Sequence, residues 1–231
     1  MTAKLRPALY IAALISGTAM PTAAVQDTSL PTIKEEVALK VAPEVDALKK
    51  MLKSLNSFQS LQSDFRLIGT NGQSLRGTVS LKKPGFVRFD FGEGAKQLYV
   101  SNGKTLSLID YEIGKVEKVP VKDTPLQVLL SDKIDLSAYK SRVVMNPDGI
   151  GSSALMVEDP DKPEMGILTL FFKPQKTTDA QSDDLMVDYW TMRDGQGHLT
   201  YVMLENPKKN VALDKSLWTF KDPRGSAKRR R

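Results

Sequence analysis

The sequence predicts a mainly β protein of the α+β class, in which a large antiparallel sheet curls into a barrel or a strongly bent sheet and two helices close it. Short runs that alternate apolar and polar residues recur over most of the chain, separated by Gly, Pro and Asn turns. Only two stretches show the signals of a helix. A sheet of roughly ten or more strands rarely stays open and flat, so we expect strong curvature.

The first residues have the features of a secretory signal peptide. Lys4 and Arg6 precede an apolar run from Ala8 to Ala19, and the small-residue site Thr22-Ala23-Ala24 follows it. We therefore expect residues 1–24 to be a signal peptide cleaved near Ala24. No later stretch approaches the ~20 apolar residues that a membrane-spanning helix requires, which predicts a soluble mature protein.

Three further segments follow from composition. Residues 25–43 are polar, contain Pro31 and Pro43, and lack a sustained period, so they are predicted to be an N-terminal leader. Residues 44–225 form the single predicted domain, and residues 226–231 a basic tail. The chain has no cysteine, which excludes a disulfide framework and a lipidated N-terminal cysteine.

The charge of the chain is concentrated at its ends. The formal net charge is +6; removal of Lys4 and Arg6 leaves +4, and five positive charges belong to Arg224 and the basic residues after it. The body of the protein therefore carries about −1. This balance argues against a broad nucleic-acid surface.

Two helices are predicted. The first covers Glu44 to Phe58, where apolar residues recur at spacings of three and four and give one apolar stripe. The second follows Asp123-Thr124-Pro125, which supplies a cap and a proline at the first helical position. Its predicted apolar residues are Leu126, Val128, Leu129 and Leu130.

The predicted strands lie on both sides of the second helix. Tight turns such as Asn71-Gly72, Pro84-Gly85 and Asn102-Gly103 separate them and favour an antiparallel meander. The predicted strands are 62–69, 74–82, 86–92, 96–101, 105–111, 115–119, 141–145, 153–158, 167–173, 185–193, 198–205 and 217–221.

One face of the predicted sheet is apolar. Val87, Phe89 and Phe91 fall on one side of their strand, and Arg88 and Asp90 on the other. Composition alone favours a filled core for such a face. The alternative is that a curled sheet with few residues to fill it leaves an apolar cavity under the helices.

The order of several short motifs resembles that of the periplasmic outer-membrane lipoprotein carrier family, LolA. These motifs extend from about Leu48 to Gly225 and include "GTVSLKKPGFVRFDF", "LYVSNGKTLSLID", "TPLQVLLSD", "RDGQGHLTYVMLEN" and "LWTFKDPRG". The resemblance implies an incomplete antiparallel barrel with helices as a lid, and an apolar cavity that carries the acyl chains of lipoproteins across the periplasm.

The resemblance also implies the partners of the protein. It would take acylated lipoproteins from an inner-membrane ATP-driven release complex and hand them to an outer-membrane receptor, as a monomer with no cofactor and no catalytic residue. A lipid- or lipoprotein-binding sensor module of the same fold is an alternative. A periplasmic hydrolase is a third hypothesis, although the single histidine, His198, has no metal-ligand spacing around it.

Strand parity and the short helix give the predicted lining of the cavity. The residues are Phe89, Phe91, Val100, Leu108, Phe171 and Trp190 from strands, and Leu126, Leu129 and Leu130 from the helix. Met156, Met165, Met186, Met192 and Met203 would suit a cavity for variable chains or would simply fill gaps.

Two basic residues near the turn at Pro84 have alternative interpretations. Lys83 stands where the family commonly has an arginine near the lid, and a lysine lacks the planar fork of that arginine. It is either a lid latch or a solvated charge at the end of a strand. Arg88 matches a polar position of the family, or simply pairs across strands.

Overall fold

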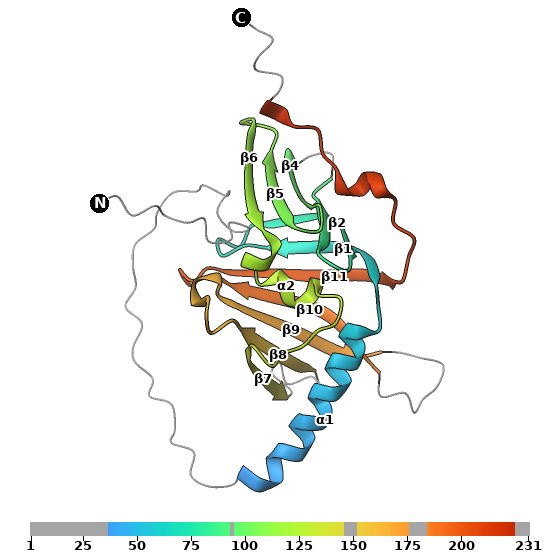
Figure 1. The fold of residues 1–231 in the computed structure, drawn as a ribbon, viewed down its shortest axis with the longest axis vertical. Coiled ribbons are helices and arrows are strands. Elements are labelled where there is room, and N and C mark those ends of the chain that lie inside the picture. The colour runs from blue at the N-terminus through green and yellow to red at the C-terminus, as the bar shows by residue number, and fades with distance from the viewer. Residues whose placement is uncertain (1–36, 93–94, 146–151, 176–183, 225–231) are drawn as a thin grey trace, which may run out of the picture.

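The structure of the protein is a computed structural model that describes residues 37–92, 95–145, 152–175 and 184–224. It contains one antiparallel sheet of 11 strands in the order β6-β5-β4-β3-β2-β1-β11-β10-β9-β8-β7 (Figure 1). β6 and β7 form the two edges of this sheet, which curves without closing. The predicted incomplete barrel is therefore confirmed. The predicted signal peptide and the basic tail lie outside the described residues.

All the predicted strands except the last are present. Their bounds are β1 Ser60–Ile68, β2 Ser74–Lys82, β3 Phe86–Asp90, β4 Gln97–Ser101, β5 Thr105–Asp110, β6 Lys115–Pro120, β7 Lys140–Met145, β8 Ser153–Glu158, β9 Ile167–Pro174, β10 Leu185–Arg193 and β11 Leu199–Lys209.

The first and last strands join two meanders at the centre of the sheet. β1 to β6 form one meander and β7 to β11 the other, and β1 pairs with β11 from Leu61 opposite Lys209 to Ile68 opposite Tyr201. The Ser63 hydroxyl donates to the Glu205 carbonyl at 2.8 Å across 142 positions of sequence. Bulges interrupt the register on β11, opposite β1, and on β10, opposite β9, and bulges strengthen the local twist of a strand.

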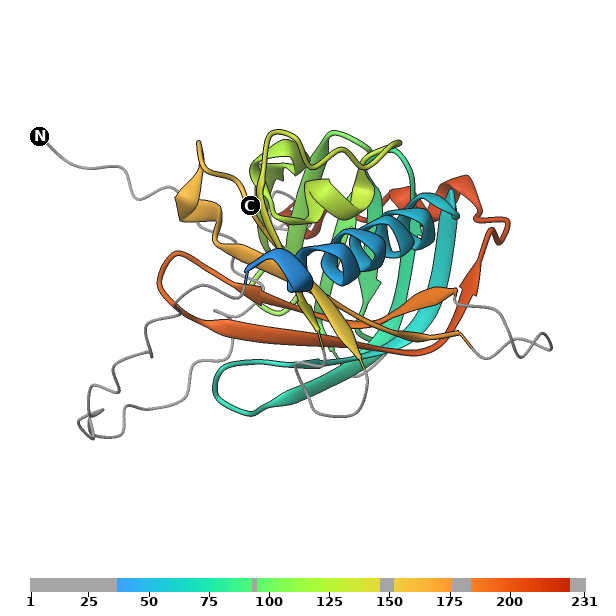
Figure 2. The same cartoon turned by 90° about the horizontal axis from the view of Figure 1, so that it is seen from below.

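Two helices cover the same face of the sheet. α1 (Val37–Asn56) contacts β7, β8 and β10, and α2 (Leu126–Leu130) follows a single 3₁₀ turn at Val121–Asp123. Figure 2 shows both helices on one side of the curved strands. This face is the concave one, and it contains the main apolar core. The predicted helical lid is thus present in the fold.

The first helix begins earlier than the sequence indicates. We predicted a leader up to residue 43 and a helix from Glu44 to Phe58, whereas α1 begins at Val37 and ends at Asn56. Pro43 suggested a boundary, but a proline removes only one i→i−4 hydrogen bond and a helix can continue on both sides of it. The predicted cap of the second helix was also wrong, because Pro125 is itself the N-cap residue of α2, no side chain caps it, and the Thr124 hydroxyl donates to the Val121 carbonyl of the preceding turn.

The last predicted strand, 217–221, is wrong. The chain there forms a 3₁₀ turn, Lys215–Trp218, within a segment that we call the C-terminal arm, residues 211–224. The Trp218 ring packs on Phe86 at a centroid distance of 5.2 Å, and the arm lies against β3. Backbone groups of this arm find a side-chain partner, Arg88, in place of a strand ladder.

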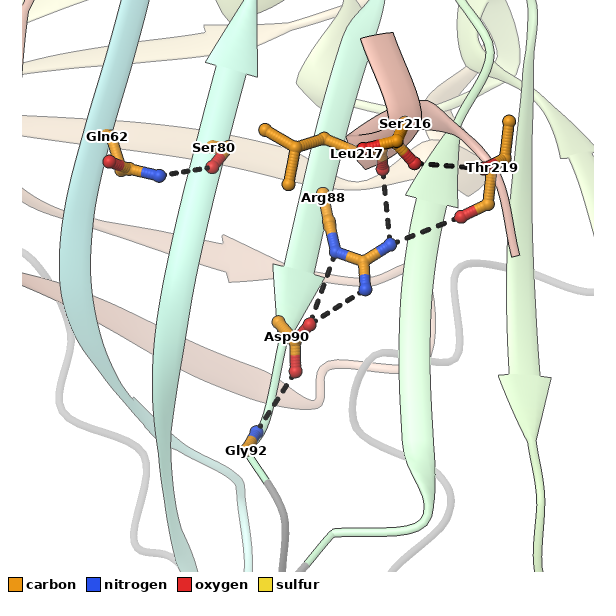
Figure 3. Close-up of polar contacts among 8 residues, drawn as sticks. All are labelled: Gln62, Ser80, Arg88, Asp90, Gly92, Ser216, Leu217 and Thr219. Atoms are coloured by element: carbon orange, nitrogen blue, oxygen red, sulfur yellow. Dashed lines mark hydrogen bonds and ion pairs between the residues drawn. The ribbon is translucent and has the colours of Figure 1, made fainter. Parts of the chain in front are cut away.

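Arg88 of β3 holds the C-terminal arm on the convex face (Figure 3). Its Nη1 donates to the carbonyls of Leu217 and Thr219 at 3.1 and 3.3 Å, and its Nη2 lies 2.8 Å from Asp90 Oδ2. The predicted alternative of a cross-strand pair is therefore wrong: its carboxylate partner, Asp90, lies two residues away on the same strand. The planar guanidinium has several N–H donors, so it can bind the carboxylate of Asp90 and the two carbonyls of the arm at once.

Candidate functional site

The concave face under the helices is the candidate site. The core there contains seven of the predicted lining residues: Phe89, Phe91, Leu108, Leu126, Leu129, Leu130 and Trp190. Edge-to-face aromatic pairs organise it, with Phe65 at 5.4 Å from Phe89 and 5.5 Å from Phe91. Phe89 lies 6.5 Å from Trp190 in the same type of arrangement. Such pairs add to the stabilisation that burial of the rings provides.

Two predicted lining residues are on the wrong face. Val100 packs with Leu98, Ile109 and Phe220 in a separate cluster under the C-terminal arm. Phe171 is only partly buried and stacks on Tyr189 at 4.1 Å, while Phe172 and Leu170 point into the main core. In both strands the residue before the error is also a large apolar or aromatic one, Tyr99 or Leu170, so parity alone could not select the inward residue.

Tyr99 is the core residue that the prediction missed in β4. It lies opposite Leu108 and packs edge-to-face on Phe91 at 5.0 Å. Burial raises the pKa of Tyr99 to about 12, and the carboxylates of Asp110 and Glu117 act in the same direction. The available signal was the pairing of β4 with β5, because residues directly opposite in an antiparallel pair point to the same face.

One small cavity among the described residues lies between the helices and the sheet, where the side chains of the core pack. A cavity of about 10 Å³ adjoins α1 and α2 there, which is about the volume that one water molecule requires. Its lining includes Phe58, Leu61, Leu81, Leu129, Met186 and Trp190. Around this cavity the described side chains are packed as the filled-core interpretation predicts, and movement of a helix would enlarge the space for an acyl chain.

A larger groove lies on the outer side of α2. Its volume is about 510 Å³, and the turns after β2 and β4 line it together with Lys104, Lys122 and Leu130. The lining mixes polar and apolar groups and does not include the aromatic residues of the core. This groove is thus distinct from the apolar cavity that we predicted.

Lys83 is a buried contact between the sheet and α1. Its side chain is 4% exposed, its Nζ donates to the Leu55 carbonyl at 2.7 Å, and the same atom lies 4.6 Å from the centroid of the Phe58 ring. Burial lowers the pKa of Lys83 to about 8, and the Asp132 carboxylate opposes this shift. A solvated charge at the end of a strand is therefore the wrong interpretation.

Polar contacts hold the ends of the segment around α2. Before the helix, Lys162 pairs with Asp123 at 2.7 Å; at its end, the Gly85 amide donates to the Leu130 carbonyl at 2.9 Å, and beyond it the Ile134 amide donates to Asn56 Oδ1 of α1 at 2.9 Å. The side chains of α2 that face the core are aliphatic. Between its two ends the helix is therefore held to the sheet by apolar contact.

Chemistry-bearing groups are sparse in the described part of the chain. Within it, no group of three or more His, Cys, Asp or Glu residues is arranged to hold a metal ion. The Nδ1 of His198 lies 3.0 Å from Asp194 Oδ2 in the exposed turn between β10 and β11, where the pair orders a hairpin. Among the described helices, none is long and apolar enough to span a membrane.

The fold and the site define a class: a half-open antiparallel barrel whose apolar inner face lies under two helices. The model of one protein family, described as outer membrane lipoprotein carrier protein LolA, matches residues 56–221. The chain belongs to this family.

Individual relatives carry the same description. The chain is 27% identical over 192 residues to an outer-membrane lipoprotein carrier protein of Azotobacter vinelandii, covering 78% of this chain and 86% of that protein. It is 28% identical over 198 residues to that of Pseudomonas aeruginosa, covering 81% and 89%. The structure is also similar to that of a LolA superfamily protein from Nitrosomonas europaea, at 10% identity and a TM-score of 0.41, covering 74% of this chain and 97% of that one.

Proposed function

We propose that this protein is a periplasmic carrier that binds the acyl chains of lipoproteins under α1 and α2. It receives them from an ATP-driven release complex of the inner membrane and delivers them, as a monomer, to a receptor at the outer membrane. The observation that carries this proposal is the continuous apolar face under two helices that are attached mainly by apolar side chains. Membership of the LolA family supports it.

Loading requires that α2 move away from the sheet. Four side chains of α2 are buried: Leu126, Val128, Leu129 and Leu130. Burial of a side chain of this kind stabilises by about 1.5–3 kcal/mol, so removal of all four from the core costs about 6–12 kcal/mol. A 16-carbon acyl chain gains on the order of 12 kcal/mol when it leaves water, at about 0.8 kcal/mol per methylene.

These two quantities are of the same size. Cargo that replaces α2 over the inner face therefore restores the apolar contact that the helix gives up. A near balance of this kind allows a partner with a slightly better apolar site to take the cargo, because α2 then returns to the sheet. Neither step requires a catalytic group.

The proposal is tested with spheroplasts that retain newly made lipoproteins in the inner membrane. We expect the purified mature protein to release labelled lipoproteins into the supernatant as a one-to-one soluble complex. His198→Ala is the matched variant, because its ring lies in the exposed turn and should release lipoprotein equally well. A wild-type protein that releases none, together with normal outer-membrane lipoproteins after depletion of the protein in its own cell, overturns the proposal.

A further inference from the structure

Trp190 contains a buried hydrogen-bond donor that no described residue satisfies. The side chain is 0% exposed, and its Nε1 has no hydrogen-bond partner within the described residues. Buried N–H groups in proteins are almost always paired, because the desolvated donor otherwise loses its hydrogen bond to water. A phenylalanine would fill an apolar core position without this penalty, so the donor calls for an explanation.

The position of Trp190 places it where cargo would lie. It comes from β10 of the second meander and lines the small cavity together with Leu129 of α2 and Phe58. Phe89 packs against its ring from the opposite half of the sheet. Displacement of α2 would remove Leu129 from this cavity and open the indole to whatever replaces the helix.

Neighbouring polar groups of the cavity are already engaged. Ser54 donates its hydroxyl to the Leu185 carbonyl at 2.6 Å. Lys209 Nζ lies 3.4 Å from the Ser57 hydroxyl at the edge of α1. Among the described lining residues, Trp190 is the one whose side-chain donor is fully buried and has no partner.

We propose that the indole N–H of Trp190 donates a hydrogen bond to the carbonyl oxygen of an ester- or amide-linked acyl chain bound beneath α2. The inference rests on the proposed function and adds a polar selection to an otherwise apolar site. An indole N–H is a donor only, so it recognises a carbonyl oxygen, and a methylene at the same place leaves it unpaired. The site would thus favour acyl chains over alkyl chains of the same length.

The test compares a matched pair of soluble probes, 1-decanoyl glycerol and 1-O-decyl glycerol, which differ in the ester carbonyl. Binding of each is measured by calorimetry below its micelle concentration, with wild-type protein and with Trp190→Phe. The variant keeps an aromatic ring but loses the donor and part of the indole, so the ester-over-ether ratio, in which the change of size cancels, is the quantity compared. We expect the ester-over-ether preference of the wild type to fall by about two- to tenfold in the variant, the size of one net hydrogen bond.

A spectroscopic readout is independent of the variant. The protein has two tryptophans, Trp190 and Trp218, so Trp218→Phe assigns the two indole N–H resonances in a ¹H–¹⁵N spectrum. The ester should move the Trp190 indole proton downfield, as a new hydrogen bond does, and the ether should not. The Trp218 resonance is the internal control, because that ring belongs to the C-terminal arm and packs on Phe86 of β3.

The outcomes separate this inference from the proposed function. If both probes bind and the ester-over-ether ratio is the same in wild type and Trp190→Phe, the inference is wrong while acyl binding stands. An indole proton that responds equally to both probes also overturns it, because the donor then serves something other than the carbonyl. If the wild type binds neither probe, the inference and the carrier proposal both fail.

Discussion

Lys83 of the turn after β2 and Leu55 in the last turn of α1 are joined by a 2.7 Å hydrogen bond from the lysine Nζ to the backbone carbonyl. The carbonyl belongs to the end of a helix, where backbone acceptors lack intrahelical partners and a positive charge is favourable. One side chain thus fastens the larger helix of the lid to the sheet.

The Lys83 contact should make stability depend on pH. Its pKa is about 8 in the folded protein, below the ordinary 10.5, so between pH 8 and 10.5 the unfolded chain binds a proton that the folded protein has released. The free energy of unfolding should therefore rise with pH across this window. We expect the wild type to gain about 1–2 kcal/mol relative to Lys83→Met between pH 7.5 and 9.5.

Urea denaturation at the two pH values measures this difference. Subtraction of the variant removes the contribution of other groups, including Tyr99, whose raised pKa acts in the opposite direction above pH 10. Lys82→Met is the matched control, because Lys82 ends the same strand and is exposed. Equal pH dependence in all three proteins would contradict a buried amine at position 83.

Leu129→Glu should abolish cargo binding while the sheet remains folded. Leu129 is 2% exposed and lines the small cavity, so a carboxylate there would be desolvated and would drive α2 away from the apolar face. Binding of a fluorescent fatty acyl probe should fall by at least tenfold, and the far-ultraviolet β signal should be retained.

Gln127→Glu is the matched control for the lid. Gln127 belongs to the same helix, is only partly buried, and borders the outer groove instead of the core. The substitution introduces the same charge at a position where the carboxylate stays in contact with water, so probe binding should be retained. Unchanged probe binding by Leu129→Glu would count against α2 as the cover of the site.

Arg88→Gln should loosen the C-terminal arm. The substitution removes the charged donor to the Leu217 and Thr219 carbonyls and the pair with Asp90, and charged hydrogen bonds of this kind contribute about 1.5–3 kcal/mol. We expect faster tryptic cleavage within residues 215–224 and a red shift of Trp218 emission.

Arg76→Gln provides the comparison for the arm. Its side chain is 68% exposed and pairs with Glu205 at 3.8 Å, an interaction that contributes little. Cleavage in the arm should stay at the wild-type rate. If Arg88→Gln also leaves the arm as resistant as before, the packing of Phe220 on Val100 and Leu98 is sufficient to hold it.

Gly77→Ala should destabilise the sheet by about 2 kcal/mol or more. A Cβ at this position would lie 1.9 Å from the Asp90 carbonyl oxygen of the neighbouring strand, and that backbone cannot retreat without breaking the register. Thermal unfolding should show a clear loss. Gly72→Ala, where a Cβ meets nothing within 4 Å but φ is +75°, should cost only about 1 kcal/mol. Similar losses of stability in both variants would contradict a clash between the Cβ at position 77 and the Asp90 backbone.

Period-two patterns and turn residues were sufficient to predict the strands, because each strand carries its own local signal. They failed where both faces of a strand carry large apolar residues: in "LYVS" and "ILTLFF", Val100 and Phe171 were assigned inward, although they pack under the C-terminal arm and on Tyr189. The face of such a strand is decided by what packs on each side. That information lies in distant segments of the chain.

The burial of polar residues near Pro84 also depends on distant segments of the chain. Nothing local distinguishes a buried lysine from an exposed one, and Lys82 and Lys83 are adjacent with opposite exposure. The acceptor for the Lys83 amine is the Leu55 carbonyl at the end of α1, 28 positions away. Likewise "LWTF" has the composition of a strand, but its Leu217 and Thr219 carbonyls accept hydrogen bonds from the Arg88 side chain and not from a neighbouring strand.

The pairing of β1 with β11 sets the order in which the sheet can be completed. A chain that emerges from its N-terminus presents the first edge of β1 early, and the strand that covers that edge is the last to arrive. During this interval the first meander has an open edge that can recruit the wrong neighbour. A product that stops short of β11 would keep this edge of β1 open, so the final strand decides whether the two meanders become one sheet.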